Sequence, residues 1–291
     1  MKQKTLNEYL REKYNRKLYK ISINAGFTCP NRDGTKGYNG CIFCSGSGSG
    51  DFAEDPCLSV TRQIERGKKR VAAKVPSEGC GYIAYFQAFT NTYAPVDRLR
   101  DIYMEAAMHP EVNIISVATR PDCLGPEVLE LLSQINEIKP VWVELGLQTI
   151  HDRTAQYIRR GFDLECYDEA VKNLRNRNID TIVHVILGLP GESFEDMLET
   201  VDYVGRSKVQ GIKLQLLHVL QGTDLADEYL SGKFSCMSLE EYTDIIKKSL
   251  DVLPDDIIIH RMTGDGDKKL LIAPKWSADK KIVLNYIRKH I

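Results

Sequence analysis

The sequence has no run of about 20 apolar residues, the length that a membrane-spanning helix needs. Its beginning, MKQKTLNEYLREKYNRK, also lacks the apolar segment of a secretory signal peptide. These two absences predict a cytoplasmic protein that does not enter a membrane. In that reducing compartment, the eight cysteines are expected to be free thiols or metal ligands rather than disulfides.

Further absences narrow the possible function. The segment GSGSG at 46–50 is not followed by the Lys-Ser/Thr of a phosphate-binding P-loop. The chain has one C-x2-C pair, and its cysteines at 57, 80, 123, 166 and 236 are scattered, so an auxiliary metal cluster is not expected. No internal repeat is visible. The sequence therefore does not indicate a nucleotide phosphate-binding motif, a repeat protein or a second cluster.

The net charge is −1, but the charges are unevenly distributed. Residues 1–20 carry seven Lys/Arg and two Glu, and residues 268–291 carry seven Lys/Arg and one Asp. Residues 62–74 form another basic stretch. Basic ends around an acidic middle favour a polyanionic partner. Ordinary solvated helix faces are the alternative explanation.

Short β-branched runs alternate with amphipathic helical patterns along most of the chain. The runs predict strands at 20–24, 82–86, 113–119, 141–146, 181–187 and 213–218, with helices at 95–108, 125–136, 164–176 and 194–207. Six strand–helix units predict an α/β fold, a partial (β/α)6 TIM-type barrel with a C-terminal α+β extension. We expect a basic N-terminal segment at 1–20, the barrel at 21–220 and the extension at 221–291.

Three cysteines fall in one polar, glycine-rich loop after the first predicted strand. Cys29, Cys41 and Cys44 have the spacing C-x11-C-x2-C, and a C-x2-C turn lets two sulfurs face one metal. One interpretation is a zinc site, with Cys57 as a fourth ligand. A second is that the cysteines bind nothing. A third is a [4Fe–4S] cluster with one iron left open, because such clusters normally have four cysteine ligands.

The stretch ISINAGFTCPNRDGTKGYNGCIFCSGSGSGDFA resembles the cluster loop of the radical S-adenosylmethionine (radical SAM) enzymes. Within that superfamily it resembles the YhcC/YtqA-type family, which is related to the Elongator catalytic subunit group. The resemblance implies that Cys29, Cys41 and Cys44 hold a [4Fe–4S] cluster and that S-adenosylmethionine (SAM) chelates its open iron. It also implies reductive cleavage of SAM to a 5′-deoxyadenosyl radical, with a flavodoxin- or ferredoxin-type electron donor.

The same resemblance implies a substrate. It points to tRNA, and to conversion of carboxymethylaminomethyluridine at the wobble position into aminomethyluridine. One alternative is a radical SAM enzyme that acts on a small metabolite. Another is a zinc-bearing RNA-binding protein without catalysis.

The resemblance and the strand pattern together give a set of candidate cofactor-binding residues near the strand ends. Residues 87–92 take the place of the superfamily's Gly-Gly-Glu segment but lack its glycines, and LGLPGE at 187–192 resembles its glycine-rich turn beside adenine. Glu144 and Gln148 share one strand face by alternation, although Glu144 could instead pair with Arg120. His184 could be a core histidine. The candidates are Gln87, Thr90, Asn91, Thr119, Arg120, Glu144, Gln148, His184, Gly188 and Lys213.

Candidate catalytic residues are fewer. Cys123 follows the third strand, where a cysteine could act in a radical reaction. His260 and Asp265 lie in the polar segment HRMTGDGDKKLLIAPKW, which could form a lid together with Arg261 and Trp276. Trp276 could stack on a base, and its alternative role is as a packing anchor.

Overall fold

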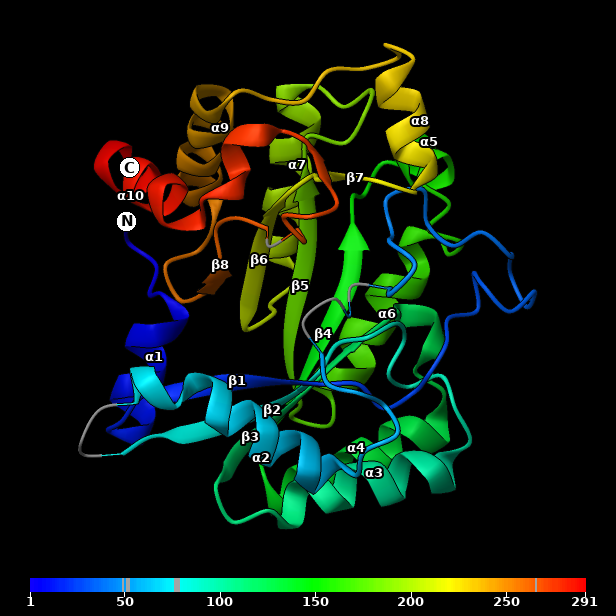
Figure 1. Cartoon of the computed structure of the whole chain (residues 1–291), viewed down its shortest axis with the longest axis vertical. Helices are drawn as coiled ribbons and strands as arrows, with labels where there is room; N and C mark the ends of the chain where they lie inside the picture. Colours follow the sequence, from blue (N-terminus) through cyan, green and yellow to red (C-terminus); the bar gives the residue numbers. More distant parts are fainter. Residues whose placement is uncertain (49, 51–52, 76–78, 265) are drawn as a thin grey trace.

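Seven parallel strands form one strongly curved sheet that leaves the barrel open (Figure 1). The computed structural model describes residues 1–48, 50, 53–75, 79–264 and 266–291. The sheet order is β1-β2-β3-β4-β5-β6-β8, so its first six strands follow chain order. This sheet contains β1 (Leu18–Ile23), β2 (Gly81–Phe86), β3 (Val112–Thr119), β4 (Val141–Gln148), β5 (Asp180–Leu187), β6 (Gly211–Leu216) and β8 (Ile258–Arg261). A small second sheet pairs β7 (Val219–Leu220) with β9 (Leu271–Ala273) in antiparallel fashion.

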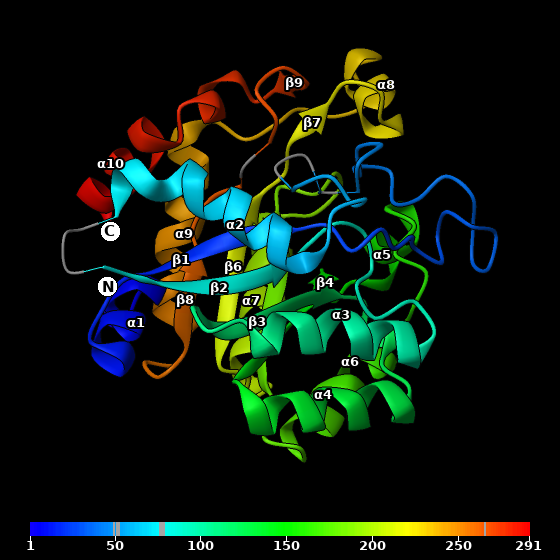
Figure 2. The ribbon, with the colours of Figure 1, turned by 60° about the horizontal axis from the view of Figure 1, so that its bottom comes forward.

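Most helices follow a strand and cover the outside of the sheet, whereas the first helix precedes the first strand (Figure 2). In chain order, the helices are α1 (Leu6–Tyr14), α2 (Val60–Val71), α3 (Val96–Met108), α4 (Pro126–Ile138), α5 (Asp152–Tyr157), α6 (Leu164–Arg175), α7 (Phe194–Arg206), α8 (Asp224–Leu230), α9 (Leu239–Val252) and α10 (Lys280–His290). None of the described helices is long and apolar enough to cross a membrane.

The six predicted strands and the four predicted helices between them are confirmed, with ends that differ by one or two residues. The partial barrel is also confirmed. Part of the predicted C-terminal extension belongs to the barrel sheet. Its strand β8 pairs in parallel with β6 and is the seventh strand of that sheet. The short apolar run at 257–259 was the sequence signal for this strand.

Alternation along the strands sorts the barrel interior into layers. Near the amino ends of the strands, the inward side chains form an apolar layer made of Leu18, Ile83, Ile114, Trp142 and Ile182. Helix α1 packs on this layer, with the Tyr9 ring 6.5 Å from the Trp142 ring. Two residues further along each strand, the inward side chains become polar. The apolar layer thus closes one end of the barrel and leaves a polar interior that opens at the carboxyl ends of the strands.

The two ends of the chain meet beside β8 (Figures 1 and 2). The Gln3 amide donates hydrogen bonds to the backbone oxygens of Leu250 and Leu253, each at 2.9 Å, and Thr5 forms a parallel bridge with Ile259. These contacts fix the seventh strand against the N-terminal segment. The basic segments at the two ends therefore lie close together in space.

Helix α7 begins with a capping box, as its sequence predicts. The Ser193 hydroxyl accepts a hydrogen bond from the Asp196 backbone N–H, and the Asp196 carboxylate accepts one from the Ser193 N–H. Two backbone donors at the helix start are therefore satisfied.

We predict that Ser193→Ala lowers the free energy of unfolding by about 1 kcal/mol, because the acceptor for the helix N-terminus is lost. Urea denaturation of the purified protein measures this change. Ser193→Asp is the matched control, since it retains a side-chain acceptor and is expected to preserve most of the stability. An equal loss in both variants would contradict the capping explanation.

Candidate active site

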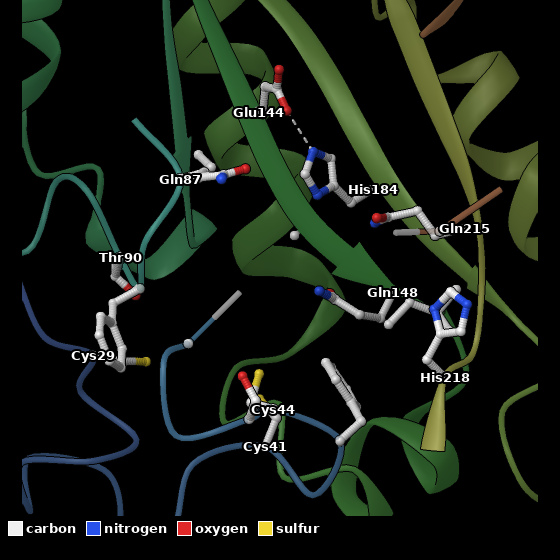
Figure 3. A pocket seen from close by; sticks show the side chains of 18 of the residues that line it. Cys29, Cys41, Cys44, Gln87, Thr90, Glu144, Gln148, His184, Gln215 and His218 are labelled. Carbon is white, nitrogen blue, oxygen red and sulfur yellow. Dashed lines mark hydrogen bonds and ion pairs between the residues drawn. The ribbon is translucent and has the colours of Figure 1, made fainter. Parts of the chain in front are cut away.

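A cavity of about 690 Å³ occupies the barrel interior and opens beside the three cysteines (Figure 3). Its wall includes Cys29, Cys41 and Cys44 at the mouth, and Glu144 and His184 in its depth. Active sites of barrel folds lie at the carboxyl ends of the strands. The cavity is therefore the candidate active site, called here the main cavity.

The cysteine loop, residues 28–44, is held by hydrogen bonds that start from its polar side chains. The Asn31 amide donates to the backbone oxygen of Arg159 at 2.7 Å and approaches Cys41 Sγ at 3.6 Å. The Arg32 guanidinium donates to the backbone oxygens of Cys44 and Ser45. Gly40 has φ +71°, and a Cβ there would lie 2.8 Å from Arg32 Nε, so only glycine fits this turn comfortably.

Positive groups surround the cysteine sulfurs. A hydrogen bond with Cys44 lowers the pKa of Cys41 to about 7, and Arg120, Asn31 and Arg32 add to this effect against the opposing effect of burial. Arg120 is itself held by a two-pronged ion pair with Asp122, with N–O distances of 2.9 Å. This setting favours the thiolate of Cys41, which is the form of cysteine that binds metals, whereas the hydrogen bond with Cys41 and burial raise the pKa of Cys44 well above its usual range.

The three cysteines fit an iron–sulfur cluster better than a single zinc ion. Sulfurs that bind one zinc lie about 4 Å apart. Among the described residues, no group of three metal-binding side chains that includes these cysteines has its ligand atoms within 4.8 Å of one another. A [4Fe–4S] cluster accepts a wider spread because each cysteine binds a different iron. Cys29, Cys41 and Cys44 are thus the residues that would hold such a cluster, and the cluster would supply one electron for cleavage of SAM.

Four of the predicted cofactor-binding residues line the mouth of the main cavity with the cysteines. They are Gln87, Thr90, Thr119 and Arg120. Asn91 is predicted for the same role, but it lies outside the cavity wall, and its amide donates to the Ala118 backbone oxygen at 2.9 Å. The polar strand ends after β2 and β3 therefore meet at the cysteine loop, as the barrel topology predicts.

Strand β4 contributes two side chains to the cavity wall, and its pairing is irregular near the second of them. The predicted alternation places Glu144 and Gln148 on one face, and both line the cavity. The pairing of β4 with β5 shifts between Gly146 and Gln148, and Gln148 has φ +67°. Figure 3 shows that the Gln148 amide points into the space between the cysteines and the Glu144–His184 pair.

Glu144 is the centre of a buried polar layer, called here the charged layer. It consists of Lys20, Tyr85, Ser116, Glu144, His184 and Lys213. Glu144 Oε1 accepts from Lys20 Nζ and Ser116 Oγ, each at 2.7 Å. Its Oε2 lies 2.8 Å from His184 Nε2 and also accepts from Lys213 Nζ. The alternative of a Glu144–Arg120 ion pair is wrong, because Arg120 pairs with Asp122.

Burial and charge act on this layer in opposite directions. Burial alone would raise the pKa of Glu144, but the charges of Lys20 and Lys213 and the hydrogen bond with His184 hold it well below its usual range. Burial, together with repulsion by Lys213, lowers the pKa of His184 to about 4. At neutral pH the layer therefore contains an ionised Glu144 and a neutral His184, which donates its Nε2 proton to the carboxylate.

Several predicted site residues lie outside the main cavity. Cys123 lines a separate cavity of about 540 Å³ beside Thr92 and Asp122, and burial raises the pKa of its thiol to about 12. His260 packs against Trp142, with ring centroids 5.1 Å apart, at the amino end of the sheet. Gly188 sits at a turn with φ +89° beside Met237. Asp265 lies outside the described residues.

The predicted lid segment contributes part of the wall. Arg261, Gly264 and Gly266 line the main cavity. Trp276 serves as a packing anchor: its indole N–H donates to the Met237 backbone oxygen at 3.0 Å, and its ring lies 5.8 Å from that of Tyr242. The alternative that the sequence offered for Trp276 is therefore correct.

The sequence reasoning missed three members of the charged layer. Lys20, Tyr85 and Ser116 project into the same space as Glu144, where Lys20 and Ser116 bond to Glu144 directly and Tyr85 bonds to Lys213. Each stands two residues after a member of the apolar layer, in the pairs 18–20, 83–85 and 114–116. That regular step was the signal that could have found them.

Residues 27–204 match the family described as Radical SAM superfamily, and residues 209–291 match the Radical_SAM C-terminal domain. The chain belongs to the radical SAM superfamily and is a radical SAM enzyme. A [4Fe–4S] cluster and SAM are the cofactors of this class.

Its relatives place the chain within the superfamily. It is 45% identical to YtqA of Bacillus subtilis over 287 residues, covering 99% of this chain and 88% of that protein. It is 36% identical to YhcC of Escherichia coli over 282 residues, covering 96% and 89%. The predicted YhcC/YtqA-type family is confirmed.

The predicted link to the Elongator group is confirmed as well. The chain is 25% identical over 194 residues to a protein of Methanocaldococcus jannaschii named tRNA uridine(34) acetyltransferase, covering 64% of this chain and 34% of that protein. In fold it resembles Elp3 of Methanocaldococcus infernus, with a TM-score of 0.68 and 15% identity over 94% of this chain and 63% of that one.

We predict that Cys41→Ala, purified without oxygen, loses nearly all of the about four irons expected per chain, because a cluster ligand is gone. Iron and sulfide analysis measures this loss. Cys57→Ala is the matched control, since Cys57 is exposed and is absent from the cavity wall. Retention of full iron by Cys41→Ala, or an equal loss in Cys57→Ala, would contradict the assignment.

We predict that Glu144→Gln lowers the free energy of unfolding by about 3 kcal/mol, because Lys20 and Lys213 lose their shared counter-ion in a buried site. Chemical denaturation of the cluster-free protein isolates this effect from cluster loss. Glu165→Gln, at an exposed position in the first turn of α6, is the matched control and should change stability by less than about 0.5 kcal/mol. Equal stability of the two variants would show that Glu144 does not balance the lysines.

Proposed function

We propose that this radical SAM enzyme removes the carboxymethyl group from carboxymethylaminomethyluridine at the wobble position of tRNA and leaves aminomethyluridine. The observation that carries this proposal is the similarity, over 194 residues, to a protein named for its action on uridine 34 of tRNA. The acetyl-transfer activity in that name is not carried over, because the similarity covers 34% of that protein.

The proposed reaction has a balanced course. The methylene between the amine nitrogen and the carboxylate loses one hydrogen atom and one electron, and a C=N bond forms. Water adds to this bond, the C–N bond breaks, and the products are the aminomethyl base and glyoxylate. The hydrogen atom ends in 5′-deoxyadenosine, and the electron passes to a one-electron acceptor of the iron–sulfur class, which offsets the electron used to cleave SAM.

The dimensions of the site support a nucleobase rather than a duplex as the group that enters. The main cavity, of about 690 Å³, reaches into the barrel beyond the cysteine loop. A wobble base stands in a single-stranded loop, so it can turn outward into such a cavity at modest cost. The charged layer would then meet the modified side chain of the base.

The charge of the surface and of the cavity also supports a polyanionic substrate. Lys69 is exposed in the last turn of α2, and Arg288 and Lys289 are exposed in the last turn of α10, whereas Lys68 and Arg70 already pair with glutamates. Glu144 is the single acidic residue among the described residues that line the main cavity. An acidic, closed cavity mouth would favour a small metabolite as substrate. Among the described residues, the mouth of the main cavity is basic instead.

The proposal includes partners and a location. A flavodoxin- or ferredoxin-type protein in the cytoplasm would supply the electron that starts each cycle. Cys41 and Cys44 lie at the rim of the cavity, where a donor could approach a cluster from outside.

We predict that the reconstituted enzyme, given SAM and a reductant, forms 5′-deoxyadenosine and aminomethyluridine from tRNA that carries carboxymethylaminomethyluridine. Mass spectrometry of the nucleosides measures both products. The same tRNA with unmodified uridine 34 is the control and should yield little of either. Equal 5′-deoxyadenosine with both tRNAs, or tRNA binding that does not weaken with salt, would overturn the proposed function.

A further inference from the structure

The charged layer contains more positive than negative groups around a single carboxylate. Lys20 and Lys213 both donate to Glu144, which also accepts from Ser116 and His184. Glu144 is fully buried, and Lys213 is 2% exposed. One carboxylate balances one ammonium, so the layer has one positive charge in excess whenever both lysines are protonated.

The nearest aromatic ring does not supply the missing negative charge. Tyr85 lies beside both lysines, with the ring centre 4.5 Å from Lys20 Nζ and 4.7 Å from Lys213 Nζ. Its hydroxyl accepts from Lys213 at 3.2 Å. Burial raises the pKa of Tyr85 well above its usual range, so the hydroxyl stays neutral. The ring attracts the ammonium groups through its π face but carries no net charge.

Among the described residues, the wall of the main cavity has more cations than acids. The described cations on the wall are Lys20, Arg32, Lys74, Arg120, Arg160 and Arg261, and Glu144 is the one acid among the described wall residues. Arg120 is offset by Asp122, which lies behind the wall. Burial and the neighbouring charges of Lys20 and Arg261 lower the pKa of Lys213 well below its usual range. A buried ammonium in such a place is costly unless an anion joins it.

The position of the charged layer separates it from the place where SAM would be chelated. Lys20, His184 and Lys213 each lie three residues before the end of their strand, which is a depth of about 10 Å. The cysteine loop follows the strand ends. Figure 3 shows the Glu144–His184 pair across the cavity from Cys41 and Cys44. If the amino acid part of SAM is bound to an iron of the cluster, the carboxylate of SAM therefore lies near the mouth and not at the charged layer.

We propose that Lys20, on the wall of the main cavity, binds a carboxylate at the end of the substrate's reacting side chain, in the depth of the barrel. Lys213 does not line the cavity, but it shares Glu144 with Lys20, and its charge would strengthen this binding. This inference rests on the proposed function, in which that side chain ends in a carboxylate. The bound carboxylate would supply the second negative charge that Lys20 and Lys213 need, since Glu144 supplies only one. It would also hold the adjacent methylene between the charged layer and the mouth, where the radical forms.

The same charges favour release of the product. The proposed product keeps the amine of the substrate and has lost the carboxylate. An ammonium group is repelled by Lys20 and Lys213, so the product leaves the site that attracted the substrate.

The test compares two anticodon stem-loop RNAs, one with the carboxymethylaminomethyl group and one with its neutral carboxamide analogue. KM and kcat are measured with cluster-loaded enzyme and SAM, and equilibrium binding of each RNA is measured without reductant. The variants are Lys20→Met and Lys213→Met, which remove a charge and keep an unbranched chain. Lys172→Met, exposed on the outer helix α6, is the matched control.

Wild-type enzyme and Lys172→Met should bind the carboxylate RNA about tenfold to a hundredfold more tightly than the carboxamide RNA. In Lys20→Met and Lys213→Met this preference should fall to about threefold or less, with iron content and SAM affinity unchanged. Those two controls confirm that each variant is folded. Lys20→Arg, which keeps the charge, should retain most of the preference that Lys20→Met loses. This pair of variants tests the inference even if Lys213→Met does not fold.

Two results would overturn the inference while the proposed function stands. In the first, wild-type enzyme converts the RNA but both lysine variants keep the full preference for the carboxylate. In the second, the variants lose affinity for SAM in place of affinity for the carboxylate RNA, which would assign the lysines to the methionyl carboxylate. Absence of any conversion by wild-type enzyme overturns the proposed function and this inference with it.

Discussion

The ion-pair network centred on Glu144 is the interaction on which the interior of this barrel depends. A buried carboxylate is tolerated only when its hydrogen-bonding capacity is filled, and here four side chains from β1, β3, β5 and β6 fill it. Because these donors come from strands on both sides of β4, the network ties the curved sheet together from within. The apolar layer below it keeps water out at the amino end, so the charges act on whatever enters from the mouth.

The cysteine loop solves a different problem at the other end of the cavity. Three thiols must reach a common centre while one side stays open to a cofactor. The loop has no regular secondary structure, so side-chain and backbone hydrogen bonds hold its shape. Asn31 and Arg32 provide these bonds, and Gly40 permits the tight turn. The positive charges of Arg120 and Arg32 help to lower the pKa of Cys41 at this rim. The mouth and the depth of the cavity thus share an excess of positive charge, although different residues create it.

Much of the fold could be predicted because local patterns determine it. Six strands, four helices and the cap at Ser193 follow from side-chain periodicity and from the chemistry of helix ends. The three cysteines that are predicted to hold a cluster stood out because they share one loop. The predicted roles of Cys123 and His260 rested on proximity along the chain to a strand end or a polar segment. Cys123 lies in a separate cavity and His260 at the opposite end of the barrel, because the direction of a side chain depends on packing that sequence distance does not reveal.

The sequence by itself determined the class of protein, the parallel barrel and the loop that would hold the cluster, since each depends on neighbours along the chain. Only the tertiary structure decided which charges meet inside. Lys20 and Glu144 are 124 residues apart, and Glu144 and Lys213 are 69 apart. The tertiary structure also decided that residues 258–261 of the C-terminal extension form the seventh strand. Ion pairs and strand pairing between distant segments arise from the curvature and register of the sheet, and these are properties of the assembled strands rather than of any one of them.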